Sequence, residues 1–243
     1  MNSLRRILIM AEMHGRDLTK RHAALGLLVA LPLSFYLASM GSGAESIIAA
    51  GVGMAFAISG ATLFSVLSSG DVDQRLVLSG YRPHELLLGR LLFLAPMGLA
   101  IATGFAVLMS AVSHPTRPWL TFVGVAAVAL VSIPFGLAVG AAVPRELEGT
   151  LVLIGVVGMQ LAVEPTSAVA RLLPFYGPRQ LISSSLATNG RIAGPLILTF
   201  AYGIALLILA RILIARRVAV TRHARTVRAG AGALRTNGRR GDA

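Results

Sequence analysis

Six stretches of the chain are apolar and almost free of charge, and short polar segments separate them. The clearest is Leu91–Val112, which has 22 residues without a formal charge. A helix of that length extends about 33 Å, enough to cross a hydrocarbon core about 30 Å thick. Helices are expected because backbone groups in lipid must be hydrogen-bonded within their own segment. The predicted spans are Ala23–Met40, Ser46–Ser69, Leu86–Val112, Trp119–Val143, Thr150–Val163 and the 19 uncharged residues between Arg191 and Arg211.

The composition agrees with an all-α membrane protein. Hydrophobic residues make up 55% of the 243 positions and charged residues only 13%, a balance that is not typical of a soluble domain of this size. The absence of Cys excludes disulfides and thiolate metal sites. The net charge of +12 does not indicate nucleic-acid binding, because most of it lies in basic segments that flank the spans.

The basic residues are divided unevenly between the two sides of this topology. Six spans place both termini on one side, together with the loops after the second and fourth spans. Of the 22 Lys and Arg residues, the other side has only Arg117, Arg171, Arg179 and Arg191. Because basic residues accumulate on cytoplasmic segments, we expect a multi-pass protein of the bacterial plasma membrane with both termini in the cytoplasm. The apolar run of Ala23–Met40 is too long for a cleaved secretory signal, so we interpret it as a retained span.

Residues 1–22 are predicted to form an amphipathic helix at the membrane surface. Its apolar side consists of Leu4, Ile7, Leu8, Ala11 and Leu18, and Arg5, Glu12 and Arg16 lie opposite. A basic amphipathic helix of this kind lies in the headgroup region and contacts anionic lipid. The alternative is a basic topology signal with some helical content.

The segment Gly70–Arg90 has the features of a short helix that leads directly into the third span. Asp71 is a favourable N-cap residue, and Gly80 is a natural helix stop. Pro83 suits the first turn of the following helix. We therefore predict a cytoplasmic helix over Val72–Ser79, and the pattern fits a solvated hairpin about equally well.

The fifth predicted span is too short to cross a bilayer alone. The 14 residues of Thr150–Val163 extend only about 21 Å as a helix. Residues 164–193 are too apolar for a free loop and contain no run long enough for a span. We predict one or two short helices that re-enter the outer leaflet, with Glu164 as a candidate outer gate. The alternative, a fifth span continuing through Pro165, would bury the Glu164 carboxylate.

Small residues at every fourth position predict that the second span is the most tightly packed helix. Close backbone approach favours helix association in lipid, and small side chains permit it. A shorter stripe of Gly136 and Gly140 lies on the fourth span. The positions predicted to pack in the second span are Gly53, Ala57, Ala61 and Ser65.

The C-terminal residues 216–243 form a basic tail that is predicted to be cytoplasmic and disordered. Arg, Ala, Gly and Thr dominate it, and its one acidic residue is Asp242. Contact with anionic lipid is expected to contribute about 1 kcal/mol for each Arg held near the surface. A solvated tail that only fixes the topology is the equally weighted alternative.

The sequence lacks the motifs of a catalytic or nucleotide-binding site, so we do not expect an enzyme. Gly-x-x-x-x-Gly-Lys-Ser/Thr, His-Glu-x-x-His and Gly-x-Ser-x-Gly are all absent. The five His residues are scattered over loops and tails, and no metal site is predicted. Ion-coupled carriers usually bury ionisable residues in the membrane, and the first, second, fourth and sixth spans contain none.

With these features the chain resembles the permease of a type-2 ATP-binding-cassette (ABC) transporter. The layout of six spans, a basic amphipathic N-terminal helix, a short fifth span and an outer re-entrant segment is similar over nearly the whole chain. The stretch Asp73–Arg90, which contains Gln74-Arg75-Leu76-Val77-Leu78-Ser79-Gly80-Tyr81-Arg82-Pro83, looks like the coupling helix of that family running into the third span.

The resemblance implies both partners and a mechanism. Two permease chains, identical or different, would pair, and separate ATPase subunits would bind ATP and Mg²⁺ and dock on the coupling loop 70–90. ATP binding would then drive export or flipping of an amphipathic, lipid-like molecule, and this chain would hold no cofactor. The implied coupling contacts are Asp71, Asp73, Gln74, Arg75, Tyr81 and Arg82. The runner-up is an ion-coupled secondary transporter, and a membrane scaffold or membrane enzyme is a third interpretation.

Overall fold

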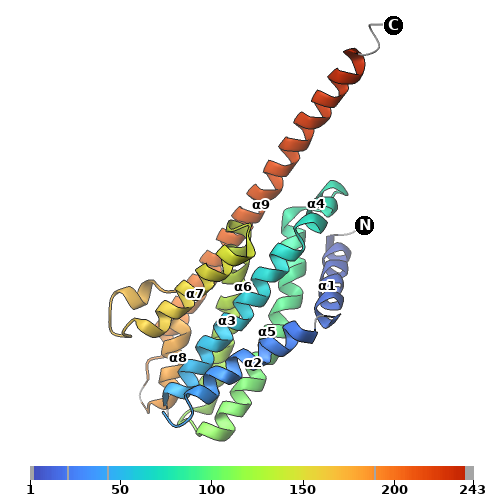
Figure 1. Cartoon of the computed structure of the whole chain (residues 1–243). Coiled ribbons are helices and arrows are strands. Elements are labelled where there is room, and N and C mark those ends of the chain that lie inside the picture. Colours follow the sequence, from blue (N-terminus) through green and yellow to red (C-terminus); the bar gives the residue numbers. More distant parts are fainter. Residues whose placement is uncertain (1–2, 21, 43, 189, 239–243) are drawn as a thin grey trace.

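The computed structural model describes residues 3–20, 22–42, 44–188 and 190–238, and for some of these, including Asp71 and the residues after Arg217, only the backbone. Every regular element in these ranges is a helix (Figure 1). The all-α prediction is therefore confirmed. The helices are α1 (Ser3–Lys20), α2 (His22–Ala38), α3 (Ala44–Ser68), α4 (Gly70–Leu78), α5 (Pro83–Ser113), α6 (Pro118–Ala142), α7 (Glu146–Ala162), the 3₁₀ helix η1 (Val169–Leu172), α8 (Tyr176–Leu186) and α9 (Ala193–Gly238).

Four helices in the described part of the chain are long and apolar enough to cross a membrane, as expected for a multi-pass membrane protein. Two shorter helices, α2 and α7, lie where the first and fifth spans are predicted: Leu25–Ala38 is the apolar part of α2, and α7 has 17 residues. Two short helices, η1 and α8, follow α7 in the predicted re-entrant segment. The four long apolar segments are Glu45–Ser68, Pro83–Ser113, Pro118–Ala142 and Ala193–Arg217.

The central helix of the bundle is α6. It packs against α3, α5, α8 and α9, and every residue from 131 to 141 is buried. In its most apolar window 78% of the residues are buried, compared with 67% for α3. The sequence predicts that α3 is the most tightly packed helix, but α6 is the more buried of the two.

Small residues set the distance between α3 and its neighbours on two sides. A Cβ atom added to Gly136 of α6 would lie 2.8 Å from Thr62 Cβ and would overlap the Ser59 carbonyl, so only glycine permits this crossing. On the α2 side, a Cβ atom added to Gly53 would lie 2.9 Å from Pro32 Cα. Gly53 therefore lies where α2 and α3 approach closely. Of the other predicted packing positions Ala57 is buried, whereas Ala61 and Ser65 are half-buried.

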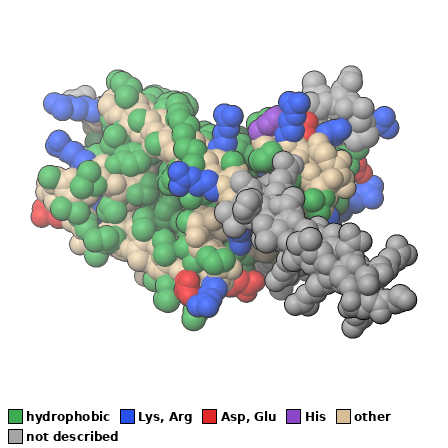
Figure 2. Space-filling view, turned by 90° about the horizontal axis from the view of Figure 1, so that it is seen from above, with side chains coloured by type: hydrophobic (Ala, Val, Ile, Leu, Met, Phe, Trp, Pro, Cys, Tyr) green, Lys and Arg blue, Asp and Glu red, His purple; other side chains and the backbone are tan. Residues whose placement is uncertain are grey.

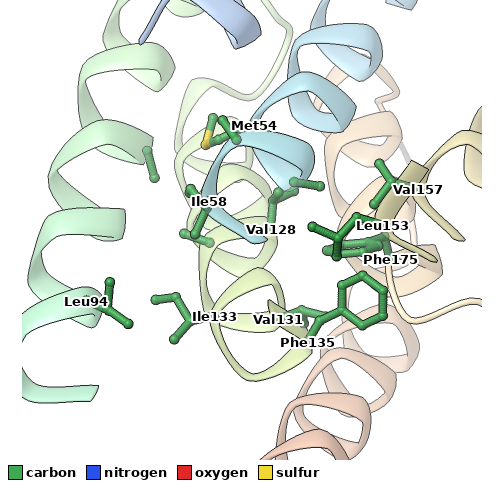
Figure 3. Close-up of a cluster of buried hydrophobic side chains, with 14 of the residues drawn as sticks. Met54, Ile58, Leu94, Val128, Val131, Ile133, Phe135, Leu153, Val157 and Phe175 are labelled. Atoms are coloured by element: carbon green, nitrogen blue, oxygen red, sulfur yellow. The ribbon is translucent and has the colours of Figure 1, made fainter. Parts of the chain in front are cut away.

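The apolar core gathers around α6 (Figure 3). Met54 and Ile58 of α3 and Leu153 and Val157 of α7 belong to the same buried cluster as the α6 side chains. The rings of Phe135 and Phe175 meet edge to face with their centroids 5.6 Å apart, which attaches the segment before α8 to this core.

Much of the outer surface of the bundle is apolar. Only 28% of the most apolar window of α5 and 17% of that of α9 is buried. The exposed side chains on α9 include Ile197, Phe200, Ile204 and Ile208. An apolar surface of this extent is unstable in water, so it requires lipid or another protein chain.

The last helix continues far beyond its apolar part. Figure 1 shows α9 projecting from the bundle at the end where α4 and α1 also lie. Its backbone is helical to Gly238, and the disorder predicted from the sequence for 216–243 stays a prediction. Arg and Ala are strong helix formers, and the stretch from 216 to 229 contains no Gly or Pro to stop the helix.

Gly136→Ala should destabilise the protein, because the added methyl group overpacks the crossing with α3. We expect the free energy of unfolding to fall by about 1–3 kcal/mol. Gly104→Ala in α5 is the matched control, since a Cβ atom there meets open space and alanine favours a helix by up to about 1 kcal/mol. Unfolding in detergent measures both; equal effects of the two variants would contradict the tight crossing.

Candidate functional site

The short helix α4 is defined by the residues at its two ends. It follows α3 after the single residue Ser69, and Asp73 N donates to Ser69 O at 2.8 Å. Ser69 is therefore the N-cap position, and the expectation that Asp71 caps the helix is wrong, because the chain resumes the helix at Gly70. The structure has a helix at this place, Gly70–Leu78, which begins two residues and ends one residue before the predicted Val72–Ser79.

Gly80 ends α4 as predicted. Its φ of +91° lies in the left-handed region that favours glycine. Tyr81 N donates to Leu76 O at 3.0 Å and Gly80 N to Val77 O at 3.1 Å, the hydrogen-bond pattern of a Schellman motif. Leu76 and Tyr81 also pack together on the same small apolar cluster. This ending turns the chain directly into α5.

The interaction that holds α4 against α5 is a buried ion pair. Arg90, about two turns into α5, is fully buried, and its Nη2 donates to Asp73 Oδ2 at 2.6 Å. The same nitrogen donates to Ser69 Oγ, and Ser69 Oγ in turn donates to Ser65 O at 2.6 Å. One guanidinium therefore joins α4 and α5 to the joint between α3 and α4. The exposed fraction of the Asp73 side chain is only 14%.

A second set of polar contacts attaches α1 to the same place. Arg6 Nη1 donates to Gly80 O at 2.8 Å and lies 3.6 Å from Glu85 Oε2. The Arg6 guanidinium carbon also lies 5.2 Å from the centroid of the Tyr81 ring. Glu85 is 3% exposed and caps α5 by accepting a hydrogen bond from Arg82 N at 2.9 Å. Arg6 thus connects α1 with both ends of the turn between α4 and α5.

Apolar side chains complete this junction of α1, α4 and α5. Met10, Val77 and Leu86 form a small buried cluster of their own. A Cβ atom added to Gly89 of α5 would lie 2.6 Å from Met10 Cβ, so α1 packs directly on the α5 backbone there. Met10 does not belong to the predicted apolar side of α1, yet it is buried at this contact, whereas Leu8 of the predicted side is 54% exposed.

The predicted coupling contacts separate into two groups. Arg75 and Arg82 are exposed, whereas Asp73, Gln74 and Tyr81 are partly buried. The side chain of Asp71 lies outside the described residues.

Sequence reasoning missed several residues of the junction. Val72 and Leu78 add exposed apolar surface to α4, with 44% and 56% of their side chains accessible. The structural role of Arg6, Glu85 and Arg90 was not predicted from the sequence either. For Arg90 a signal existed, because an Arg inside an apolar run must find a partner.

The opposite end of the bundle uses arginines to cap helices. Arg179 of α8 donates to Gln160 O at 2.5 Å and to Val163 O at 3.3 Å, both at the C-terminus of α7. Arg117 donates to Thr188 O, just after α8. Guanidinium groups stabilise helix C-termini by pairing with their carbonyls and dipole. Glu164 follows α7 with its side chain exposed, and its role as a gate stays a prediction.

Other site chemistry is limited. Within the described residues, no three His, Asp or Glu side chains gather closely enough to hold a metal ion.

A scan against protein-family models and a search of curated proteins find no match to this chain. The junction of α1, α4 and α5 is the most organised polar site that the described residues form, and we take it as the candidate functional site.

Removing either member of the Asp73–Arg90 pair should destabilise the protein strongly. Arg90→Leu and Asp73→Leu each leave a buried charge uncompensated, at an expected cost of about 3–5 kcal/mol in the free energy of unfolding. The double variant should cost much less than the sum of the two. The exposed pair Arg145–Glu148 serves as a control and should contribute about 0–1 kcal/mol. Additive effects at positions 73 and 90 would contradict the pairing.

Arg179→Leu should loosen the attachment of α8 to α7. Losing hydrogen bonds from a charged donor to the α7 carbonyls is expected to cost about 1.5–3 kcal/mol. Hydrogen exchange of residues 157–165 should increase. Arg171→Leu is the control, because that side chain is exposed; equal exchange in both variants would show that Arg179 does not cap α7.

Proposed function

We propose that the chain is the membrane-spanning permease subunit of an ATP-driven transporter, and that α4 is its contact for a separate ATPase subunit. The observation that carries this proposal is the construction of α4. Val72, Arg75 and Leu78 of α4 are exposed, and Arg82 at the start of α5 adds a second exposed arginine next to them. The other side of α4 is fixed to the bundle by the Asp73–Arg90 ion pair. Mixed apolar and Arg surface of this kind is typical of protein interfaces.

A coupling element must transmit movement, and the contacts of α4 suit that task. It continues from α3 through one residue, joins α5 through the Gly80 turn and is connected to α1 through Arg6. Packed elements with discrete polar contacts move as units rather than deforming. A partner that displaces α4 would therefore displace three helices.

The proposed topology has six spans, with α2 and α7 crossing as the two short ones. The end that carries α4 would face the cytoplasm. Figure 2 shows the molecule from this end, with Arg side chains at several places on the surface. The arginines at the opposite end support the same orientation, because Arg179 caps α7 there and Arg117 donates to Thr188 O in the segment after α8. The bacterial plasma membrane is the compartment that we propose.

Two such chains would form the transport path, with the exposed apolar surfaces facing lipid and each other. The expected cargo is an amphipathic or lipid-like molecule that is exported or flipped. ATP and Mg²⁺ would be bound by the ATPase subunits, which must bind one permease conformation more tightly than the other in order to shift it. Anionic lipid would contact α1 and the basic tail.

The deciding experiment is purification of the chain from its native membrane, followed by an ATPase assay of the preparation. We expect a phosphate-loop ATPase to co-purify, with activity that depends on this chain. Arg75→Glu reverses an exposed charge on α4 and should lower the stimulated ATPase activity and transport about tenfold or more. Arg145→Glu, exposed at the start of α7, should leave both unchanged.

Two results would reject the proposal. Full ATPase stimulation and transport with Arg75→Glu would remove α4 as the docking element. Transport by this chain alone in vesicles, driven by an ion gradient and without ATP, would favour the secondary-transporter alternative.

A further inference from the structure

A small cavity of about 20 Å³ lies where α3, α6, α7 and α8 meet. One water needs about 10–15 Å³ on the same measure, so the space fits a single group of that size. Its wall is mostly apolar and includes Val128, Val157 and Phe175, which Figure 3 labels. Among the described lining residues the polar side chains are Gln160 of α7 and Arg179 of α8. We call this space the Gln160 cavity.

The side chain of Gln160 has an unmet need for hydrogen bonds. The residue is only 1% exposed, and neither Nε2 nor Oε1 has a hydrogen-bond partner among the described residues. A buried amide without a partner is destabilising, because it has lost its bonds to water and gained none in return. The amide lines the cavity, so a group held there can supply the missing bond.

The Arg179 guanidinium lies on the wall of the same cavity. Its Nη1 donates to Gln160 O at 2.5 Å and to Val163 O at 3.3 Å. A guanidinium has five N–H donors, so those on Nη2 and Nε are available for another acceptor. The structure shows no hydrogen bond between this guanidinium and the Gln160 side chain. A molecule that both accepts and donates can connect the two.

The chemistry of the wall decides between a dry and a wet cavity. A space lined only by aliphatic and aromatic groups stays dry, whereas a buried water is retained where two to four polar partners reach it. The Gln160 cavity offers Oε1 as an acceptor, and Gln160 Nε2 and the Arg179 N–H groups as donors. These partners and the volume suit one water.

We propose that the Gln160 cavity binds one water molecule, which accepts a hydrogen bond from Arg179 and donates one to the Gln160 side chain. The water completes the contact between α7 and α8 that the bonds from Arg179 to the two α7 carbonyls begin. It also explains how a glutamine is accommodated among the apolar side chains of this interface. The inference rests on the packing of α7 and α8 and is independent of the proposed transport function.

The test is X-ray radiolytic labelling of the purified full-length protein in detergent, read by mass spectrometry. Hydroxyl radicals that X-rays generate from a bound water label the side chains beside it. Phe175 lines the cavity and is 3% exposed, whereas Phe105 is 6% exposed and does not line it. We expect label on Phe175 above the level of Phe105. Label on Phe175 no higher than on Phe105 would show that the cavity is dry and would overturn the proposal.

Gln160→Met keeps a side chain of similar length and removes both amide groups. The label on Phe175 should fall to the level of Phe105, because the water loses its contact on α7. Gln180→Met is the matched control: it is the same substitution at a half-buried position of α8 that does not line the cavity, and it should retain the label. Retained label in Gln160→Met, or equal loss in both variants, would overturn the proposal. If Gln160→Met does not fold, the comparison of Phe175 with Phe105 in the unchanged protein still decides it.

Discussion

The buried positive charge of Arg90 constrains the whole α4 end of the molecule. A guanidinium without solvent exposure is tolerated only where an opposite charge and hydrogen-bond acceptors surround it. Asp73 supplies the charge and Ser69 a further acceptor, and both belong to the turn between α3 and α4 or to α4 itself. The position of α4 is therefore fixed by electrostatics as well as by chain connectivity. A short helix of nine residues would have little stability on its own.

The interior of the bundle uses a different principle. Around α6 the contacts are apolar and close, and Gly136 lets the backbones of α3 and α6 approach within the distance that a side chain would occupy. Dispersion contacts at such crossings replace the hydrophobic driving force that lipid does not provide. Polar interactions are concentrated at the two ends: ion pairs at the α4 end and guanidinium caps on helix carbonyls at the other.

In the proposed function a partner would move the membrane domain from the α4 end, and the separation of apolar and polar contacts fits that function. The apolar crossings keep the helices together, while the polar junction of α1, α4 and α5 joins the exposed face of α4 to three helices.

Hydrophobic runs and turn residues act locally, so they are enough to predict the helical class, most of the long apolar segments, the short helix before Gly80 and the break after α7. The same patterns overestimate the packing of α3 relative to α6. The packing of the helices against one another was needed to show that Asp73 pairs with Arg90 while Arg75 remains exposed. The spacing of residues around a helix gives their relative directions, but which direction is inward depends on neighbours that are distant in the chain. For the same reason the pairing of Arg6 with Glu85, 79 residues apart, could not be seen before the helices were packed.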